Sequence, residues 1–305
     1  MITRTATAYS QVRVRASRRP TVPFVLLAPA AGVVVLLFGG GLALGLAQSL
    51  GYLPAAGMSE LTLAHFARVL GDPDFFTSLG LTFYLAFAST AIACGISVAA
   101  ALAFNALAGR SRITQFVFQI PLTVPHLVIA VAVVFMLAPN GLLSRLLLNL
   151  GLINSSADFP LLVNDRWGVG IMASYIWKEV PFITLMILAV LRGAGSELQD
   201  VGRTLKAGPW QCFRHVTLPI IFPSLGAAGL IVFAYTFGAF EVPYLLGQTY
   251  PMMLPVWAYR SYSDVDLLSR PEGIAVGLVI AAVVIGAVAL AQSLTQAARR
   301  RGVVL

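Results

Sequence analysis

Apolar and polar residues follow one another along this chain in long blocks. Six apolar blocks lie at residues 23–47, 75–107, 113–137, 167–191, 218–246 and 273–295. As a helix, about 20 apolar residues cross a hydrocarbon core of roughly 30 Å and satisfy their own backbone hydrogen bonds. The pattern therefore predicts an all-α integral membrane protein with six transmembrane helices.

Prolines and polar residues modify this pattern at three places. Pro121 and Pro125 lie four apart in the third block, so we expect a distorted helix whose freed carbonyl groups are satisfied by neighbouring helices. Pro219 stands near the start of the fifth block, where a helix N-terminus tolerates proline. Between the first two blocks, the sequence LTLAHFARVL predicts a short amphipathic helix at the membrane interface.

The composition excludes a single aqueous globule. Hydrophobic residues make up 58% of the chain and charged residues only 10%, whereas soluble domains carry about 25% charged residues. The net charge of +8 would suit a nucleic-acid partner, but the basic residues gather at the ends of the apolar blocks. That placement indicates a topology signal instead.

The distribution of basic residues predicts the orientation. With the N-terminus inside, the predicted cytoplasmic segments hold fourteen of the twenty lysines and arginines, and such a bias marks the cytoplasmic side. We therefore expect cytoplasmic tails at 1–22 and 299–305, a six-helix domain at 23–298, and a location in a bacterial cytoplasmic membrane.

One long polar segment, residues 192–218, falls in the second predicted cytoplasmic loop. Its spacing of Asp200-Val201-Gly202, Lys206-Ala207-Gly208 and Val216-Thr217-Leu218-Pro219 resembles the EAA loop of permease subunits of binding-protein-dependent ABC transporters. That loop reads E-A-A, three residues, G, nine residues, I-x-L-P. Lys206 departs from it, since the family has glycine there, and Gly208 is the alternative residue for the turn.

Further stretches extend the resemblance over about residues 20–300. IWKEVPF in the fourth block, FGAFEVPYLLG in the fifth and YPMMLPVWAYRSY after it look like the same family, whose permeases have the type I importer fold. These stretches look most like the branch that includes polyamine and aminoalkylphosphonate importers.

The resemblance implies that the loop docks in a groove of a separate ATP-binding subunit. Trp210 and Phe213 lie three apart and would form one apolar face for that groove, while charged residues add polar contacts. The alternative is a loop that lies flat on the lipid headgroups. The predicted coupling residues are Glu197, Asp200, Gly202, Arg203, Lys206, Ala207, Gly208, Trp210, Phe213, Arg214, Leu218 and Pro219.

The chain contains no G-x-x-x-x-G-K-[ST] phosphate loop, so ATP and Mg²⁺ are expected on the partner ATPase. The expected partners are two ATPase copies, a second permease that is similar or identical, an extracytoplasmic solute-binding protein and membrane lipid, with no nucleic acid. The histidines and cysteines lack metal-type spacing, and no nucleophile–base pair appears. We therefore predict no metal, cofactor or catalytic residue on this chain, and no enzyme.

Three ionisable residues, Lys178, Glu179 and Glu241, lie within or near the ends of apolar blocks, where charge usually faces a partner or a water-filled path. A proline follows two residues after each glutamate, which suggests irregular backbone lining a cavity. The predicted translocation path comprises Lys178, Glu179, Tyr235, Phe237, Phe240 and Glu241.

Two interpretations of these charged residues remain open. Glu241 and the aromatic rings would attract a cationic solute such as a polyamine, or Glu241 would serve structure by pairing with Lys178 or reaching the outer interface. His126 is expected to be a hydrogen-bonded packing residue. The rival function is an ion-coupled secondary transporter with Glu179 and Glu241 as proton sites, although that function does not explain the loop motif.

Overall fold

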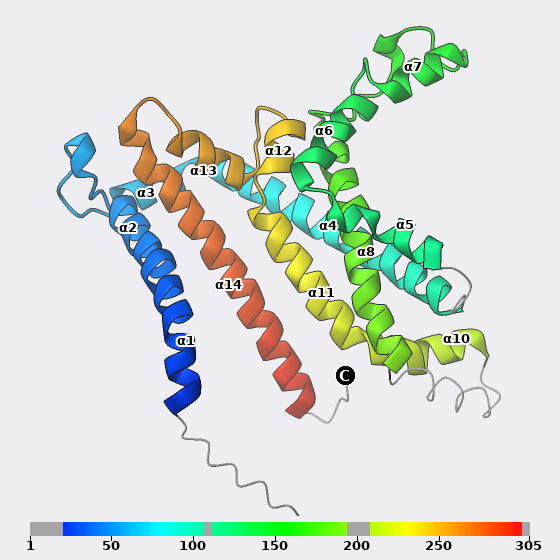
Figure 1. The fold of residues 1–305 in the computed structure, drawn as a ribbon. Helices are drawn as coiled ribbons and strands as arrows, with labels where there is room; N and C mark the ends of the chain where they lie inside the picture. The colour runs from blue at the N-terminus through cyan, green and yellow to red at the C-terminus, as the bar shows by residue number, and fades with distance from the viewer. Residues whose placement is uncertain (1–20, 107–111, 194–207, 301–305) are drawn as a thin grey trace, which may run out of the picture. The chain divides into compact units, whose positions relative to one another are not determined.

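The computed structural model describes residues 21–106, 112–193 and 208–300, almost all of them helical (Figure 1). Within these residues, six helices are long and apolar enough to cross a membrane, which confirms the predicted all-α fold with six spans. They run over Leu26–Ser49, Pro73–Ala106, His126–Asn149, Val169–Gly193, Pro209–Gly238 and Leu267–Gln296.

The chain divides into two units, one up to Leu46 and one from Ala47 onward. The first contains α1 (Thr21–Val34), the π-helical turn η1 (Val35–Gly39) and most of α2 (Gly40–Ser49). These three elements follow one another without a break and form the first candidate span.

The second unit contains the other helices, joined by short turns. They are η2 (Pro54–Ala56), α3 (Ala64–Gly71), α4 (Pro73–Ala106), α5 (Arg112–Thr123), α6 (His126–Leu137), α7 (Leu142–Asn149), η3 (Ser156–Asp158), α8 (Val169–Gly193), α10 (Pro209–Cys212), η4 (Phe213–Thr217), α11 (Leu218–Gly238), α12 (Glu241–Leu246), α13 (Leu254–Tyr262), η5 (Leu267–Ser269) and α14 (Arg270–Arg300). The predicted amphipathic helix is present as α3.

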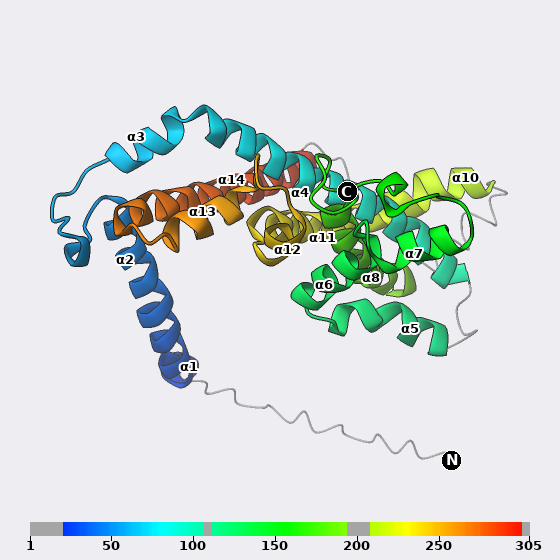
Figure 2. The same ribbon diagram turned by 90° about the horizontal axis from the view of Figure 1, so that it is seen from above.

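Helix α8 forms the centre of the second unit, because α4, α5, α6 and α11 all pack against it (Figure 2). Its residues Ile183, Ile187 and Leu191 are buried in one apolar cluster with small residues of α4 and with Val232 of α11. Small side chains such as Ala93 let helices approach closely. Ser97 of α4 also donates a hydrogen bond of 3.0 Å to the carbonyl of Val180, which ties α8 to α4 at mid-length.

A second close approach joins α13 to α14 and depends on Gly273. A Cβ atom at this position would lie 2.7 Å from the carbonyl oxygen of Ala258 and 2.8 Å from the backbone nitrogen of Tyr262. Backbone atoms cannot move aside as a flexible side chain does, so only glycine fits here. At Gly277, one turn later in α14, the same Cβ would meet nothing within 4 Å.

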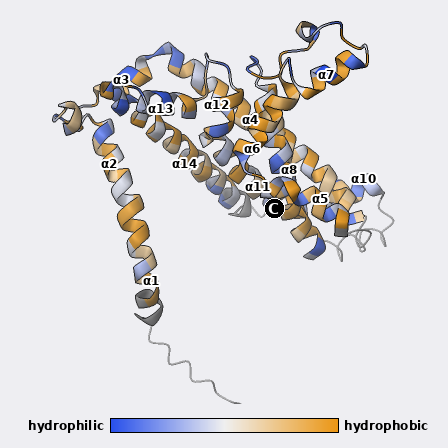
Figure 3. Cartoon of the chain, turned by 45° about the horizontal axis from the view of Figure 1, so that its top comes forward, coloured by the Kyte–Doolittle hydropathy of each residue, from blue (hydrophilic) through white to orange (hydrophobic). Residues whose placement is uncertain are grey.

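The outward surface of the second unit is largely apolar (Figure 3). On α5, Ile113 is 75% exposed and Phe116 is 71% exposed, while Gln115 and Gln119 of the same helix face inward. They line a cavity of about 240 Å³ together with Arg192. This is the reverse of a helix on a water-soluble protein.

Two predicted spans need correction. The third is two helices, since α5 ends at Thr123 and α6 begins at His126. The fifth begins earlier and ends earlier than predicted, because the helix starts at Pro209 and stops at Gly238. Pro219 therefore lies within the helical run. It follows directly on the π-helical turn η4, a wider turn of the kind that accommodates a missing backbone donor.

Candidate functional site

A group of polar side chains lies among the apolar helices where α6, α8, α11 and α12 come together. We call it the central polar cluster and define it as His126, Tyr175, Lys178, Glu179, Tyr235 and Glu241. Four of these residues were predicted as path residues from the sequence, and the fold brings them together from three helices, α8, α11 and α12.

The break in the third span is the first feature of this cluster. Pro125 has no N–H to donate to the carbonyl of Pro121, and it disfavours helical geometry at Val124. Its own backbone is extended, with φ −60° and ψ 145°. The last carbonyl groups of α5 are thus left without partners in their own helix.

Lys178 of α8 satisfies these carbonyl groups. Its Nζ donates to the oxygens of Val124 at 2.5 Å, Pro121 at 3.2 Å and Leu122 at 3.4 Å. A lysine ammonium has three N–H donors, and the end of α5 carries the negative end of the helix dipole. The prediction that a neighbouring helix satisfies the freed carbonyls is confirmed, and the partner is a charged one.

Glu179, the next residue along α8, contacts the helix beyond the break. Its Oε1 lies 3.5 Å from Nε2 of His126, the first residue of α6. The imidazole ring also packs against the ring of Tyr235, with centroids 4.6 Å apart. Glu179 itself is only 8% exposed, so this carboxylate sits inside the helix packing.

Glu241 lies at the outer side of the cluster and is exposed, in the first turn of α12. Both Glu241 and Glu179 interact electrostatically with Tyr235. The backbone is irregular just before Glu241, as predicted, since α11 ends at Gly238. Around Pro181 the same prediction is wrong, because α8 continues as a helix through that residue.

The predicted pairing of Glu241 with Lys178 does not form among the described residues, where the ion pairs are Arg68–Glu272 and His126–Glu179. Lys178 is instead engaged by backbone carbonyls. Neither does the described part of the chain place three or more His, Cys, Asp or Glu side chains where they could hold a metal ion.

The aromatic path residues separate into two kinds. Phe240 packs against Tyr259 at 4.3 Å and Tyr244 at 4.9 Å between ring centroids, next to the exposed Glu241. Phe237 is completely buried and packs edge-on against Phe83, so its ring belongs to the helix packing and does not line an open path.

Tyr175 is a cluster member that sequence reasoning missed. It is fully buried, interacts electrostatically with Tyr235, Glu179 and Glu241, and its hydroxyl has no hydrogen-bond partner among the described residues. Helical spacing was the available signal, because Tyr175 precedes Lys178 by three residues and Glu179 by four, which puts all three on one side of α8.

The predicted coupling segment is described only from Gly208 onward. Glu197, Asp200, Gly202, Arg203, Lys206 and Ala207 lie outside the described residues. Trp210 is 67% exposed, and its ring lies 5.5 Å from that of Phe213, tilted by 32°. The two rings thus form one face, beside the exposed Arg214, whereas Leu218 packs into the core.

Gly208 does not take the left-handed conformation that would require glycine. It has φ −68° and ψ 162° at the start of α10, and its N–H donates to Oε1 of Gln211 at 3.0 Å. An added Cβ would meet only that oxygen, at 3.8 Å. Within this chain, other residues fit equally well at this position.

A family described as "Binding-protein-dependent transport system inner membrane component" matches residues 91–301. Two relatives are the molybdenum transport system permease protein ModB of Azotobacter vinelandii and the sulfate transport system permease protein CysW of Synechocystis sp. ModB is 24% identical over 51% of this chain and 65% of its own length. CysW is 28% identical over 72% of this chain and 77% of its own length.

Among solved structures, the chain is similar to part of a bacterial alginate ABC transporter in complex with an alginate pentasaccharide-bound periplasmic protein. The TM-score is 0.75 at 21% identity, over 92% of this chain and 94% of the other. At this identity the likeness establishes the fold.

Proposed function

This chain belongs to the family of inner membrane components of binding-protein-dependent transport systems, and we propose that it is a permease subunit of an ATP-driven ABC importer. As a multi-pass protein of the bacterial inner membrane, it would form the solute path with a second permease. Two copies of an ATPase would drive it from the cytoplasm. An extracytoplasmic binding protein would deliver the solute.

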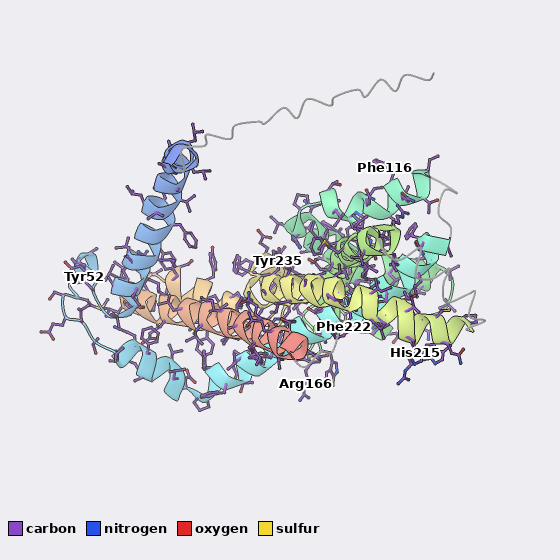
Figure 4. The ribbon with its side chains drawn as sticks, turned by 90° about the horizontal axis from the view of Figure 1, so that it is seen from below. Tyr52, Phe116, Arg166, His215, Phe222 and Tyr235 are labelled. Atoms are coloured by element: carbon purple, nitrogen blue, oxygen red, sulfur yellow. The ribbon has the colours of Figure 1, made fainter. Side chains whose placement is uncertain are left out.

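One observation carries this proposal: a single helical run connects the predicted coupling surface to the central polar cluster. It extends from Pro209 to Gly238 over 30 residues, about 45 Å at 1.5 Å per residue. Trp210 lies at one end and Tyr235 near the other; Figure 4 labels His215, Phe222 and Tyr235 in that order along it. Movement of a partner docked at Trp210 would therefore reach the cluster through one continuous element.

The composition of the cluster supports a small polar or cationic solute, for example a polyamine. Glu179 and Glu241 both act on Tyr235, and the only cation of the cluster, Lys178, is already engaged by three carbonyl oxygens. A carboxylate beside aromatic faces attracts ammonium groups. The relatives named above carry other solutes in their names, so this solute class rests on the cluster alone.

The predicted outer end offers a docking surface for the binding protein. A cavity of about 570 Å³ lies between α4 and the loops before α8 and α13, and it is lined by Tyr84, Arg166, Trp167 and Tyr250, among others. The Arg166 guanidinium lies 5.8 Å from the centre of the Trp167 ring. Arginine and large aromatic residues are the types that dominate binding energy at interfaces.

The hydrogen bond that Tyr250 donates to Asp74, 2.6 Å long, raises the pKa of the Tyr250 hydroxyl, with smaller effects of burial and of the Asp74 charge. The hydroxyl at the rim of this cavity therefore remains a neutral donor at physiological pH, and it presents no negative charge to a partner.

Reconstitution in proteoliposomes tests the proposal. With the partner ATPase, the second permease and the binding protein, uptake should require Mg-ATP on the ATPase side and survive a protonophore. Uptake by this chain alone that a protonophore abolishes would instead establish the secondary transporter with Glu179 and Glu241 as proton sites.

Glu241→Gln tests the solute class. We expect the KM for a radiolabelled diamine to rise about tenfold with little change in kcat, because a tenfold loss corresponds to about 1.4 kcal/mol of charge-assisted binding. Glu60→Gln is the matched control, since Glu60 is also exposed but lies in the loop after η2. An unchanged KM in the Glu241 variant would remove Glu241 from the solute path.

A further inference from the structure

The break at Val124-Pro125 places two new helix ends inside the bundle, and they carry opposite partial charges. The end of α5 presents carbonyl oxygens and therefore partial negative charge, while the start of α6 presents N–H groups and partial positive charge. In hydrocarbon, such groups are costly unless they are paired.

Two consecutive residues of α8 match these two ends in sign. The cation Lys178 lies on the carbonyl end of α5, and the acid Glu179 lies beside His126 at the start of α6. The same level of α8 is tied to α4 through Ser97 and the carbonyl of Val180. A fixed point on α8 therefore holds both sides of the break.

From this geometry we propose that the carbonyl oxygens of Pro121, Leu122 and Val124 form a binding site for a primary alkylammonium group. In the native protein the occupant is the chain's own Lys178, which locks α5 onto α8. Three acceptors match the three N–H donors of an ammonium group. A quaternary ammonium ion has no N–H donor and does not fit this chemistry.

The site makes a specific prediction about vacancy. Lys178→Ala removes three methylene groups and the ammonium, which together have the composition of propylammonium. The vacated space should therefore accept propylammonium from solution and regain the lost contacts. This inference concerns the chain's own stability and holds whether or not the proposed transport function is correct.

The experiment measures thermal unfolding of the purified chain in detergent. Lys178→Ala should lower the midpoint by at least about 5 °C, since several charge-assisted hydrogen bonds are lost, and propylammonium should restore most of that loss. Tetramethylammonium at the same concentration and ionic strength should not. Lys178→Met, whose side chain fills the space, should be destabilised but not rescued.

Equal effects of propylammonium and tetramethylammonium on Lys178→Ala, or a Lys178→Met midpoint equal to that of the native protein, would overturn the proposal. If Lys178→Ala is degraded in cells, expression with and without propylamine supplies the same test through the amount of folded protein recovered. A yield that does not respond to propylamine then counts against the site.

Discussion

Replacing Trp210 and Phe213 together with alanine is expected to abolish ATP-driven uptake while the protein remains in the membrane. The two rings form one exposed face at the start of the long helix, and buried aromatic anchors at interfaces contribute about 2–4 kcal/mol each. Loss of both should weaken docking of the ATPase more than a hundredfold. Co-purification of the ATPase and uptake into proteoliposomes measure the effect.

Phe222→Ala is the control for this double variant. Phe222 is also an exposed ring, at 49%, on the same helical run but three turns farther from its start, so it removes similar area away from the coupling surface. Normal uptake by the Trp210/Phe213 variant would eliminate the coupling role. Failure of that variant to insert would show instead that the rings serve folding.

The second large effect is expected at the crossing of α13 and α14. Gly273→Val would push a side chain against the backbone of Ala258 and Tyr262, where a Cβ alone already lies at 2.7–2.8 Å. Overpacking costs about 1–3 kcal/mol and more where the neighbour is backbone, so the unfolding midpoint should fall by about 5–10 °C. The measurement is thermal unfolding in detergent.

Gly277→Val controls for the helix propensity of valine, because it makes the same change one turn later in the same helix. A Cβ there meets nothing within 4 Å, and the midpoint should change little. Equal midpoints for the two variants would show that α13 can move away from α14 without cost, contrary to the close fit described above.

Hydropathy alone predicted the number and type of the long helices, because crossing a bilayer imposes a length that is visible in the sequence. The predicted second span at 75–107 matches Pro73–Ala106, and the fourth at 167–191 matches Val169–Gly193 within two residues. The fifth was misplaced because hydropathy stops at the last apolar residue, whereas the helix continues from Pro209 through polar residues.

The partners of the charged residues were harder to predict. The sequence indicated that Lys178 and Glu179 needed partners, and it indicated that Pro125 would free carbonyl groups. It did not show that the first answers the second, because that depends on how α5 rotates against α8. Tyr175 was missed for a related reason: a buried tyrosine looks like any apolar residue until its neighbours are known.

The outward apolar face of α5 sets which substitutions this helix tolerates. On a soluble protein, exposed positions accept almost any polar residue and buried ones accept few. Here the rule is reversed: Ile113 and Phe116 should accept any apolar residue and reject charge, while Gln115 and Gln119 keep their polarity beside Arg192. Natural variation along this helix should therefore be greatest in shape on the outside and smallest in polarity on the inside.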